Sequence, residues 1–307
     1  MTDDALLALG RALLGHGYRF TTVTPATHAR VNARPGNDRG SSLAAVFGWS
    51  RPAPAGGLPA DVFDAGRAAG VLVPHGNGWR STLRASTLHE HLFFHSAYPT
   101  TQADAVFFGP DTYRFAAAID AYLAGGHKVG RAVDIGCGAG PGAVVVALAR
   151  LGADVYAVDI NDEAVRLTAV NVLLAGATAV KPRRSDLLSA LEGDFDLIVA
   201  NPPYLLDPDE RVYRHGGGGL GEGLSLAIAA EASGRLAPGG TLLLYTGSAI
   251  VDGGDRFRAM VLPKLSACGL EANYVELDPD VFGEELLEPA YAEADRIAAV
   301  LVIGKRP

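Results

Sequence analysis

The chain of 307 residues is long enough for two domains, and its 49% hydrophobic and 20% charged residues are typical of a globular protein in water. Its apolar runs are too short to cross a membrane, and its acidic, amphipathic start differs from a signal peptide. Two cysteines are too few for a disulfide framework. We therefore expect a cytoplasmic protein with no membrane partner. The net charge is −8, whereas residues 1–105 carry nine Lys/Arg against seven Asp/Glu, so the acidic remainder is not expected to attract nucleic acid unspecifically.

The first 80 residues or so predict short helices separated by breaks rich in glycine and proline. The following stretch, GVLVPHGNGWRSTLRAST, predicts two strands joined by a hairpin turn at residues 75–78. Helices followed by a hairpin are typical of a winged-helix module. We therefore expect residues 1–100 to form a smaller α+β domain with a winged-helix-like pattern.

Three arginines of this part, Arg30, Arg34 and Arg39, lie in HARVNARPGNDRGSS with only one aspartate among them. The segment is either a solvated loop or a loop that contacts phosphates, and both interpretations stay open here.

Three histidines in HEHLFFH, namely His89, His91 and His95, would share one face of a strand and could bind a metal there. Because no cysteine or strong set of carboxylates accompanies them, surface histidines on a hairpin are the favoured interpretation, and we predict no metal site.

From about residue 130 onward, strand-like apolar runs alternate with helical patterns, which is typical of a parallel sheet covered by helices on both faces. Asn161 stands where a helix N-cap belongs, and Gly152 and Gly176 stand where glycines end helices. The predicted strands are residues 131–136, 154–160, 195–201, 241–247, 271–277 and 296–304, and the predicted helices are 142–152, 162–176, 224–240 and 255–269.

A glycine-rich loop, VDIGCGAGPG, follows the first of these strands. Its glycines let the backbone approach a ligand closely, and Asp134 adds a carboxylate to the loop. The second strand ends in Asp159, which can accept hydrogen bonds from both hydroxyls of a ribose. GAGPGA within the loop also satisfies a loose dinucleotide fingerprint. However, a carboxylate here repels a pyrophosphate and suits a cationic ligand that carries an amino acid, such as S-adenosylmethionine.

A third acidic residue, Asp186, precedes Leu187 just after the next predicted strand, in RRSDLLSAL. Asp186 can contact an adenine amino group, or it can cap a short helix over Leu187–Leu191. The sequence favours neither role over the other.

The apolar run of DFDLIVANPPYLLD stops at Asn201, Pro202, Pro203 and Tyr204. An amide or aromatic-amine nitrogen is a poor nucleophile, and the Asn201 side-chain oxygen and the Pro202 carbonyl can accept hydrogen bonds from its two N–H groups. The prolines stiffen the turn, and Tyr204 can stack on a planar target. A plain Pro-Pro turn that ends a strand is the alternative interpretation.

Residues 105–305 resemble class I S-adenosylmethionine-dependent methyltransferases: VDIGCGAG and VYAVDIN resemble their first two motifs, and NPPY is similar to the signature of enzymes that methylate exocyclic nitrogens. The glycine-rich stretch 216–223 resembles the HemK/PrmC glutamine methyltransferases. The resemblance implies an α/β, Rossmann-like sheet of seven strands, the last antiparallel, in a methyltransferase domain over residues 101–307. It also implies that FFGPDTYRFA (107–116) covers the cofactor. The implied cofactor contacts are Thr112, Tyr113, Asp134, Gly136, Cys137, Gly138, Gly140, Asp159, Ile160, Asp186, Leu187 and Asn201.

The chain departs from the glutamine methyltransferases in residues 1–100, which choose the substrate, and in the insert 278–294. The favoured function is methylation of a protein glutamine amide. The alternatives are methylation of an adenine or guanine amino group in RNA or DNA, a non-catalytic S-adenosylmethionine-binding partner protein, and an NAD-linked oxidoreductase. The predicted partner is a macromolecular substrate, either protein or nucleic acid.

Overall fold

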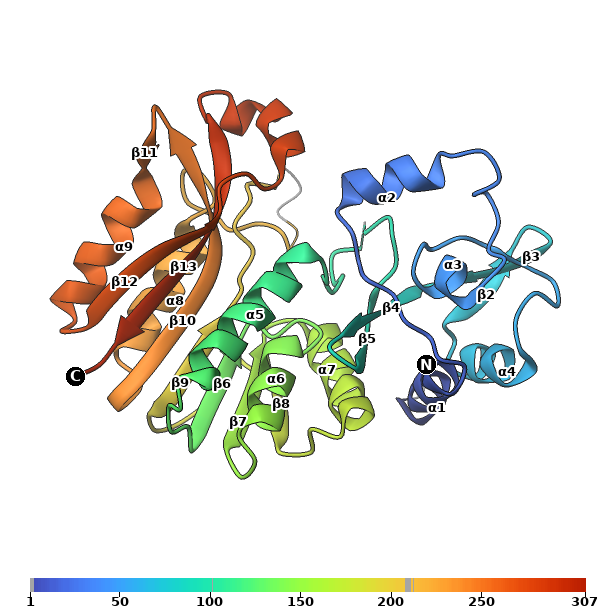
Figure 1. Cartoon of the computed structure of the whole chain (residues 1–307), viewed down its shortest axis with the longest axis horizontal. Helices are drawn as coiled ribbons and strands as arrows, with labels where there is room; N and C mark the ends of the chain where they lie inside the picture. The colour runs from blue at the N-terminus through green and yellow to red at the C-terminus, as the bar shows by residue number, and fades with distance from the viewer. Residues whose placement is uncertain (1–2, 101, 208–210, 212) are drawn as a thin grey trace.

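A computed structural model of the protein describes residues 3–100, 102–207, 211 and 213–307 (Figure 1). Its front part, coloured blue to cyan, lies beside a larger α/β part. Within the described residues, no helix is both long and apolar enough to traverse a lipid bilayer. The cytoplasmic location stays a prediction from composition.

The front part contains a three-stranded antiparallel sheet in the order β1-β3-β2. The expected hairpin is confirmed, because His75 pairs with Gly78 and the turn residue Gly76 has a φ of 54°. A single helix, α4, lies between β1 and β2, and the winged-helix pattern stays a prediction. The elements are α1 (Asp3–Gly15), α2 (Pro25–Asn32), α3 (Leu43–Phe47), β1 (Ala53–Pro54), α4 (Ala60–Ala68), β2 (Leu72–His75) and β3 (Gly78–Ser81).

A second hairpin, β4 (Leu83–Leu88) and β5 (His91–Ser96), connects the front part to the α/β part. Asn171 of helix α7 (Asp162–Ala175) holds it in place. The Asn171 side chain accepts a hydrogen bond from Phe94 N (2.8 Å) and donates to Phe94 O (3.0 Å) and to Ala139 O (2.9 Å) in the glycine-rich loop. Because one hydrophobic core runs through both parts, the division into residues 1–100 and 101–307 stays a prediction, and residue 101 itself lies outside the described residues.

The histidine prediction is wrong for His95, which is fully buried in β5. Its ring stacks on Phe108 with centroids 5.1 Å apart, and its Nε2 lies 2.7 Å from Ser86 Oγ. The hairpin lies between two layers of the protein, so the inner face of β5 is part of the core. His89 lies in the turn and is 3.1 Å from Asp120, and the described residues contain no group of three potential ligands that could hold a metal.

The α/β part confirms the predicted seven-stranded sheet, in the order β8-β7-β6-β9-β10-β13-β12 with β11 paired to the end of β10. β13 runs antiparallel to both of its neighbours. The strands are β6 (Arg131–Ile135), β7 (Asp154–Asp159), β8 (Val180–Arg184), β9 (Phe195–Ala200), β10 (Leu236–Val251), β11 (Gly254–Asp255), β12 (Glu271–Asp278) and β13 (Arg296–Lys305).

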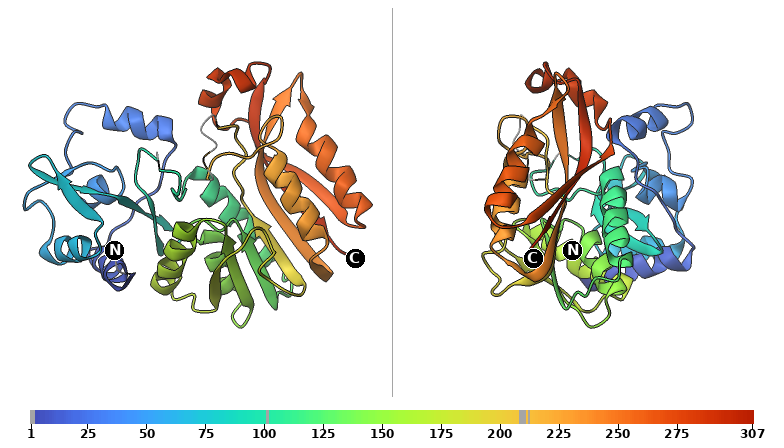
Figure 2. Two further views of the ribbon diagram at one scale, coloured as in Figure 1. Left: turned by 180° about the vertical axis from the view of Figure 1, so that it is seen from behind. Right: turned by 60° about the vertical axis from the view of Figure 1, so that its left-hand side comes forward.

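Helices cover both faces of the sheet, which is why its central strands are mostly apolar on both faces (Figure 2). In β9, Leu197 and Val199 belong to the core under α5–α7, whereas Ile198 and Ala200 belong to the core under α8 and α9. The further helices are α5 (Pro110–Ala124), α6 (Pro141–Ala149), α8 (Gly223–Ser233), α9 (Arg256–Ala267) and two short 3₁₀ turns, η1 (Gly283–Leu287) and η2 (Pro289–Tyr291).

The predicted helix signals have mixed outcomes. Asn161 caps α7, since its side-chain oxygen accepts a hydrogen bond from Glu163 N, and Gly176 ends this helix with a φ of 70°. Gly152 has a φ of 90° and lies two residues after the C-cap of α6. The short helix predicted over Leu187–Leu191 is wrong: the chain forms a turn there, in which Leu187 has a φ of 46°, a conformation that interrupts a right-handed helix.

Candidate active site

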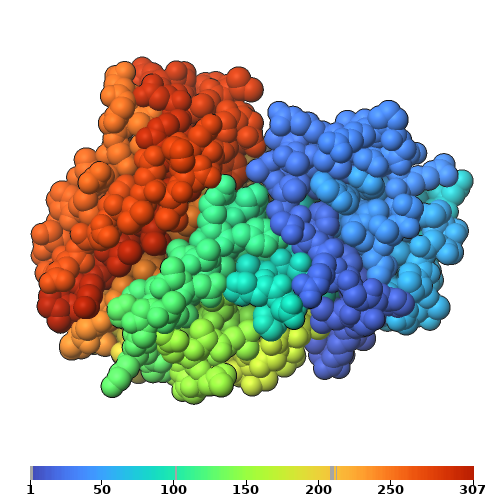
Figure 3. Space-filling view, in the orientation of Figure 1, coloured from blue at the N-terminus to red at the C-terminus, as the bar shows by residue number. Residues whose placement is uncertain are grey.

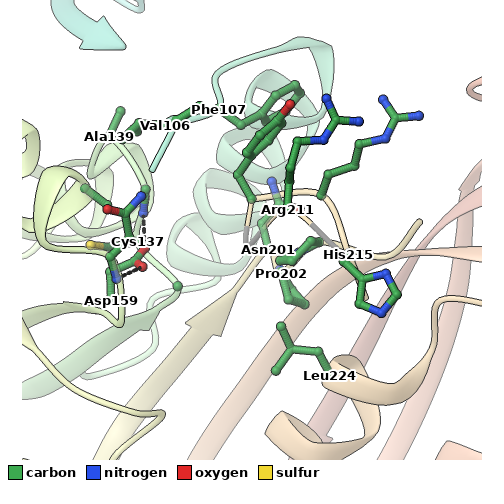
Figure 4. A pocket seen from close by; sticks show the side chains of 18 of the residues that line it. Val106, Phe107, Cys137, Ala139, Asp159, Asn201, Pro202, Arg211, His215 and Leu224 are labelled. Atoms are coloured by element: carbon green, nitrogen blue, oxygen red, sulfur yellow. Dashed lines mark hydrogen bonds between the residues drawn. The ribbon is translucent and has the colours of Figure 1, made fainter. Parts of the chain in front are cut away.

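A cavity of about 630 Å³ lies at the carboxyl ends of β6, β7, β8 and β9. This is the edge where ligands bind in open α/β sheets. Figure 4 shows the glycine-rich loop and Asp159 on one side of Asn201 and Pro202, and Arg211 and His215 on the other. Residues of the front part, including Pro25 and Tyr98, complete the wall. In Figure 3 the blue front part and the orange C-terminal part flank the green segment that contains α5.

The glycine-rich loop forms one wall, to which Gly136, Cys137 and Gly138 contribute. The N–H groups of Gly136 and Cys137 both donate to Val158 O, at 2.8 and 3.0 Å, which ties the loop to the end of β7. Gly136 has a φ of 68°, and a side chain placed there would project into open space. The loop therefore presents bare backbone to a ligand.

Asp159 closes this wall at the end of β7. Its Oδ2 accepts a hydrogen bond from Gly138 N and its Oδ1 accepts one from Asn161 N, both at 2.9 Å (Figure 4). Burial raises the pKa of Asp159. Each carboxylate oxygen keeps a lone pair for a further donor, which suits the two hydroxyls of a ribose. Ile160 (50% exposed), Asp186 and Leu187 line the cavity next to it, and their contact with a cofactor stays a prediction.

Three predicted ligand contacts lie behind the described cavity wall: Asp134, Gly140 and Tyr113. Asp134 is buried, and its Oδ2 accepts a hydrogen bond from Ala143 N at 3.0 Å in the first turn of α6. Gly140 is the N-cap of α6, and the Tyr113 hydroxyl accepts from Thr22 N at 3.0 Å. These residues shape the wall from behind.

Thr112, another predicted contact, lines the cavity. Its hydroxyl accepts a hydrogen bond from Gly109 N at 3.2 Å at the start of α5. It therefore positions the segment that precedes this helix.

The acceptor turn, residues 201–204, follows β9 and reaches the centre of the cavity. The Asn201 side chain is half-buried, and neither its amide nor the Pro202 carbonyl hydrogen-bonds to any described residue. Pro203 also lines the cavity. Two unused acceptors next to a ligand wall are what an N–H-bearing substrate requires.

Tyr204 does not form the open stacking platform that we expected. It is only 7% exposed, and its ring packs edge-on against Phe282, with centroids 5.9 Å apart. A side chain at Gly247 would come within 2.2 Å of the Tyr204 ring, so the ring fills the space over that glycine. Tyr204 therefore fastens the turn to the strand beside it.

The hydrogen-bond partner of Tyr204 is Asp111, in the first turn of α5. Sequence reasoning missed this residue. Tyr204 and Tyr245 each donate a hydroxyl to one of its oxygens, both at 2.7 Å. Arg114 lies 3.4 Å from Asp111 and 2.7 Å from Asp278. The carboxylate is 2% exposed, and burial raises its pKa although these partners lower it. No local sequence signal marks Asp111, because both tyrosines come from distant segments.

The opposite wall is built on Asp207, whose carboxylate is fully buried. Arg211 Nε donates to it at 2.8 Å, and this interaction lowers the pKa of Asp207. Arg214 lies 3.4 Å from the same carboxylate and donates to Glu285 at 2.6 Å. In the described part of this wall the charges of Asp207 and Glu285 are therefore matched by those of Arg211 and Arg214, and none of these four was predicted as a site residue.

We expect Tyr204→Phe to lower the free energy of unfolding by about 1–3 kcal/mol, because a buried carboxylate loses one of its donors. Tyr98→Phe is the matched control. Its hydroxyl makes no hydrogen bond with a described residue, so the cost there should stay within about 0.5 kcal/mol. Urea unfolding of both variants measures the difference. Equal losses would show that Asp111 does not depend on Tyr204.

Burial raises the pKa of Asp134 from 3.8 to about 7. The folded state then holds this proton more tightly than the unfolded chain does. The contribution of Asp134 to stability is therefore full below pH 3.8 and is lost as the pH rises towards about 7. We expect the unfolding free energy of the wild type minus that of Asp134→Asn to fall by up to about 1.4 kcal/mol per pH unit over this interval. Urea unfolding without ligand at pH 4.5, 5.5 and 6.5 measures it, and a constant difference would contradict the prediction.

Comparison with known proteins agrees with this architecture. Residues 119–250 match the family model of the methyltransferase small domain. The chain is 34% identical over 168 residues to the release factor glutamine methyltransferase of Deinococcus radiodurans. The aligned region covers 50% of this chain and 55% of that protein. It is 36% identical over 136 residues to the ribosomal protein uL3 glutamine methyltransferase of Xanthomonas campestris. The aligned region there covers 40% of this chain and 44% of that protein. The chain thus spans about half the length of the curated relatives that it matches.

Among solved structures, the tRNA methyltransferase of M. jannaschii has a TM-score of 0.50 at 17% identity, over 73% of this chain and 57% of that one. At this identity the similarity concerns the fold. The cavity suits the cofactor of these enzymes, because Asp159 offers acceptors for a ribose and Gly136 leaves open space beside it. The chain therefore contains a domain that matches the methyltransferase small domain and is similar to the HemK/PrmC-type glutamine methyltransferases, and S-adenosyl-L-methionine is the cofactor that this match supports.

Proposed function

We propose that the protein methylates a side-chain amide nitrogen of a protein substrate, most simply that of a glutamine. One observation carries the proposal: Asn201 and Pro202 line the cavity next to the wall formed by the glycine-rich loop and Asp159. The curated relatives named as glutamine methyltransferases support this choice of acceptor.

The acceptor turn compensates for the weak nucleophilicity of an amide. When bound, S-adenosylmethionine would supply an electrophilic methyl group. Asp159 would hold its ribose, and the glycine-rich loop would hold its amino-acid end. The Asn201 side chain and the Pro202 carbonyl accept hydrogen bonds from the two N–H groups of the acceptor amide. They hold its nitrogen in line with the methyl group and stabilise the positive charge that develops on it. The proton is lost after transfer, so no strong base is needed at the site.

The rigidity of the turn matters as much as its chemistry. Pro202 and Pro203 restrict the backbone, and Tyr204 is held by Asp111 at 2.7 Å. The acceptor oxygens are thus in place before the substrate arrives, and no reorganisation is required during transfer.

A macromolecular substrate is consistent with the composition of the cavity mouth. Pro25 at the start of α2, together with Tyr98 and Pro99, lines the cavity from the front part. Arg211 and Asn201 line the same cavity. We propose that the front part recognises the polypeptide around the modified residue.

A nucleic acid is the second candidate substrate. The helix that starts at the cavity wall with Pro25 also carries the exposed Arg30, and exposed Arg34 and Arg39 follow it. These arginines could contact phosphates. The acidic α/β part and the match to glutamine methyltransferases favour the protein substrate.

We expect Asn201→Ala to lower turnover by about 100-fold or more, because one preorganised acceptor is lost, while affinity for S-adenosylmethionine changes little. Label transfer from radiolabelled cofactor measures turnover, and calorimetry measures affinity. Full turnover in this variant would exclude the acceptor role of Asn201. No cofactor binding by the wild type would instead exclude catalysis altogether.

The substrate class follows from incubating the protein with labelled cofactor and cell extract, and we expect label in protein glutamine. The triple variant Arg30→Glu, Arg34→Glu, Arg39→Glu should then retain its cofactor affinity. If nucleic acid is the substrate, this variant should lose methylation, and binding should weaken with salt at a slope near −0.9 per duplex phosphate contacted. Reversal of the exposed Arg11, Lys128 and Arg258 is the charge-matched control. Label in an adenine or guanine base would overturn the proposed acceptor.

A further inference from the structure

His215 lies directly beside the acceptor turn and has no role in the transfer described above. Its backbone forms an isolated parallel bridge with Leu205, and Gly216 N donates to Leu205 O at 2.8 Å. Because Leu205 follows Tyr204, the position of His215 is fixed relative to the turn. The ring lines the cavity, and Figure 4 shows it next to Pro202.

One hydrogen bond sets the tautomer of this ring. The backbone N–H of Asp207 donates to His215 Nδ1 at 3.2 Å. A nitrogen that accepts a hydrogen bond carries no proton, so the proton of the neutral ring is on Nε2. Nε2 makes no hydrogen bond within the described part of the chain and is not sealed from solvent. His215 therefore presents an unused N–H donor at the cavity wall.

An acceptor amide needs such a donor. Asn201 and Pro202 satisfy its two N–H groups, but its carbonyl oxygen also loses water when the side chain enters the cavity. An unpaired carbonyl in that position weakens binding substantially. The two arginines on this wall already hold the carboxylates of Asp207 and Glu285. His215 presents a ring N–H on the same wall.

A neutral donor also suits the chemistry better than a cation. A positive charge at the carbonyl oxygen would withdraw electron density from the nitrogen that must attack. As the methyl group arrives, the carbonyl oxygen becomes a weaker acceptor, so a hydrogen bond there favours the bound substrate more than the transition state. A donor at this place therefore acts on substrate affinity and on the choice of substrate.

We propose that His215 recognises the carbonyl oxygen of the acceptor amide through its Nε2–H, and thereby selects a carboxamide over a simple amine. The inference rests on the proposed function, since it assigns the third hydrogen bond of the same amide.

Two substitutions separate the two ring nitrogens. His215→Asn keeps an acceptor for Asp207 N but has no group at the Nε2 position, whereas His215→Gln keeps a donor there. With the protein labelled in the extract experiment as substrate, we expect His215→Asn to raise KM by about 10-fold with kcat within about 3-fold of the wild type. His215→Gln should restore KM to within about 3-fold. Equal KM values in all three proteins, or a loss confined to kcat, would overturn the inference.

A second measurement does not depend on activity. Long-range ¹H–¹⁵N spectra of the wild type report the ring tautomer of His215, and we expect a proton on Nε2. Titration of the protein, loaded with S-adenosylhomocysteine, with propionamide should shift the Nε2 resonance, whereas propylamine should not. A proton on Nδ1, or equal responses to both compounds, would overturn the role of His215. Label in nucleic acid would overturn the proposed function and this inference with it, whereas label in protein glutamine together with the contrary spectra would overturn the inference alone.

Discussion

A buried carboxylate controls the geometry of the acceptor site. Asp111 lies in the core with both oxygens occupied by tyrosine hydroxyls, one from the acceptor turn and one from β10. A buried carboxyl group, whether ionised or protonated, is tolerated only while its hydrogen-bond partners keep their positions. The start of α5, the turn after β9 and the middle of β10 are therefore held together by one side chain. The placement of Asn201 depends on this junction.

The two walls of the cavity differ in their polar groups. The wall of the glycine-rich loop and Asp159 is built from backbone N–H groups and one carboxylate, and it leaves acceptors for a polar ligand. The opposite wall consists of ion pairs around Asp207 that neutralise one another. Such a wall attracts neither anions nor cations strongly. It suits an uncharged planar group such as a carboxamide, which must be recognised by hydrogen bonds and shape.

The parts of the molecule that sequence predicted are those with local signals. The alternation of apolar strands and helices predicts the sheet, because burial on both faces makes strands such as β9 apolar over consecutive positions, here Leu197–Ala200. Asn161, Asp159 and Asn201 occupy positions that chain order alone places at one edge. Asp111 and Asn171 could not be found in this way, since the tyrosines that bond Asp111 lie 93 and 134 residues away in the chain and Phe94 lies 77 residues from Asn171.

The errors have the same origin. His95 was expected at the surface because a hairpin of unknown environment usually exposes its histidines, yet both faces of β5 are covered. Tyr204 was expected to be an open platform because its distant partner, Asp111, was not visible in the sequence. Asp134 was placed in the ligand wall because its loop is there, but its side chain points to the start of α6.

Asn171 gives the structure a thermodynamic consequence. The same amide holds the backbone of β5 in the hairpin next to the front part and the backbone of the glycine-rich loop. Any substrate that shifts this hairpin when it docks on the front part also strains or relaxes the loop. Linkage then requires reciprocity: if docking tightens the hold on S-adenosylmethionine, the cofactor tightens docking by the same factor.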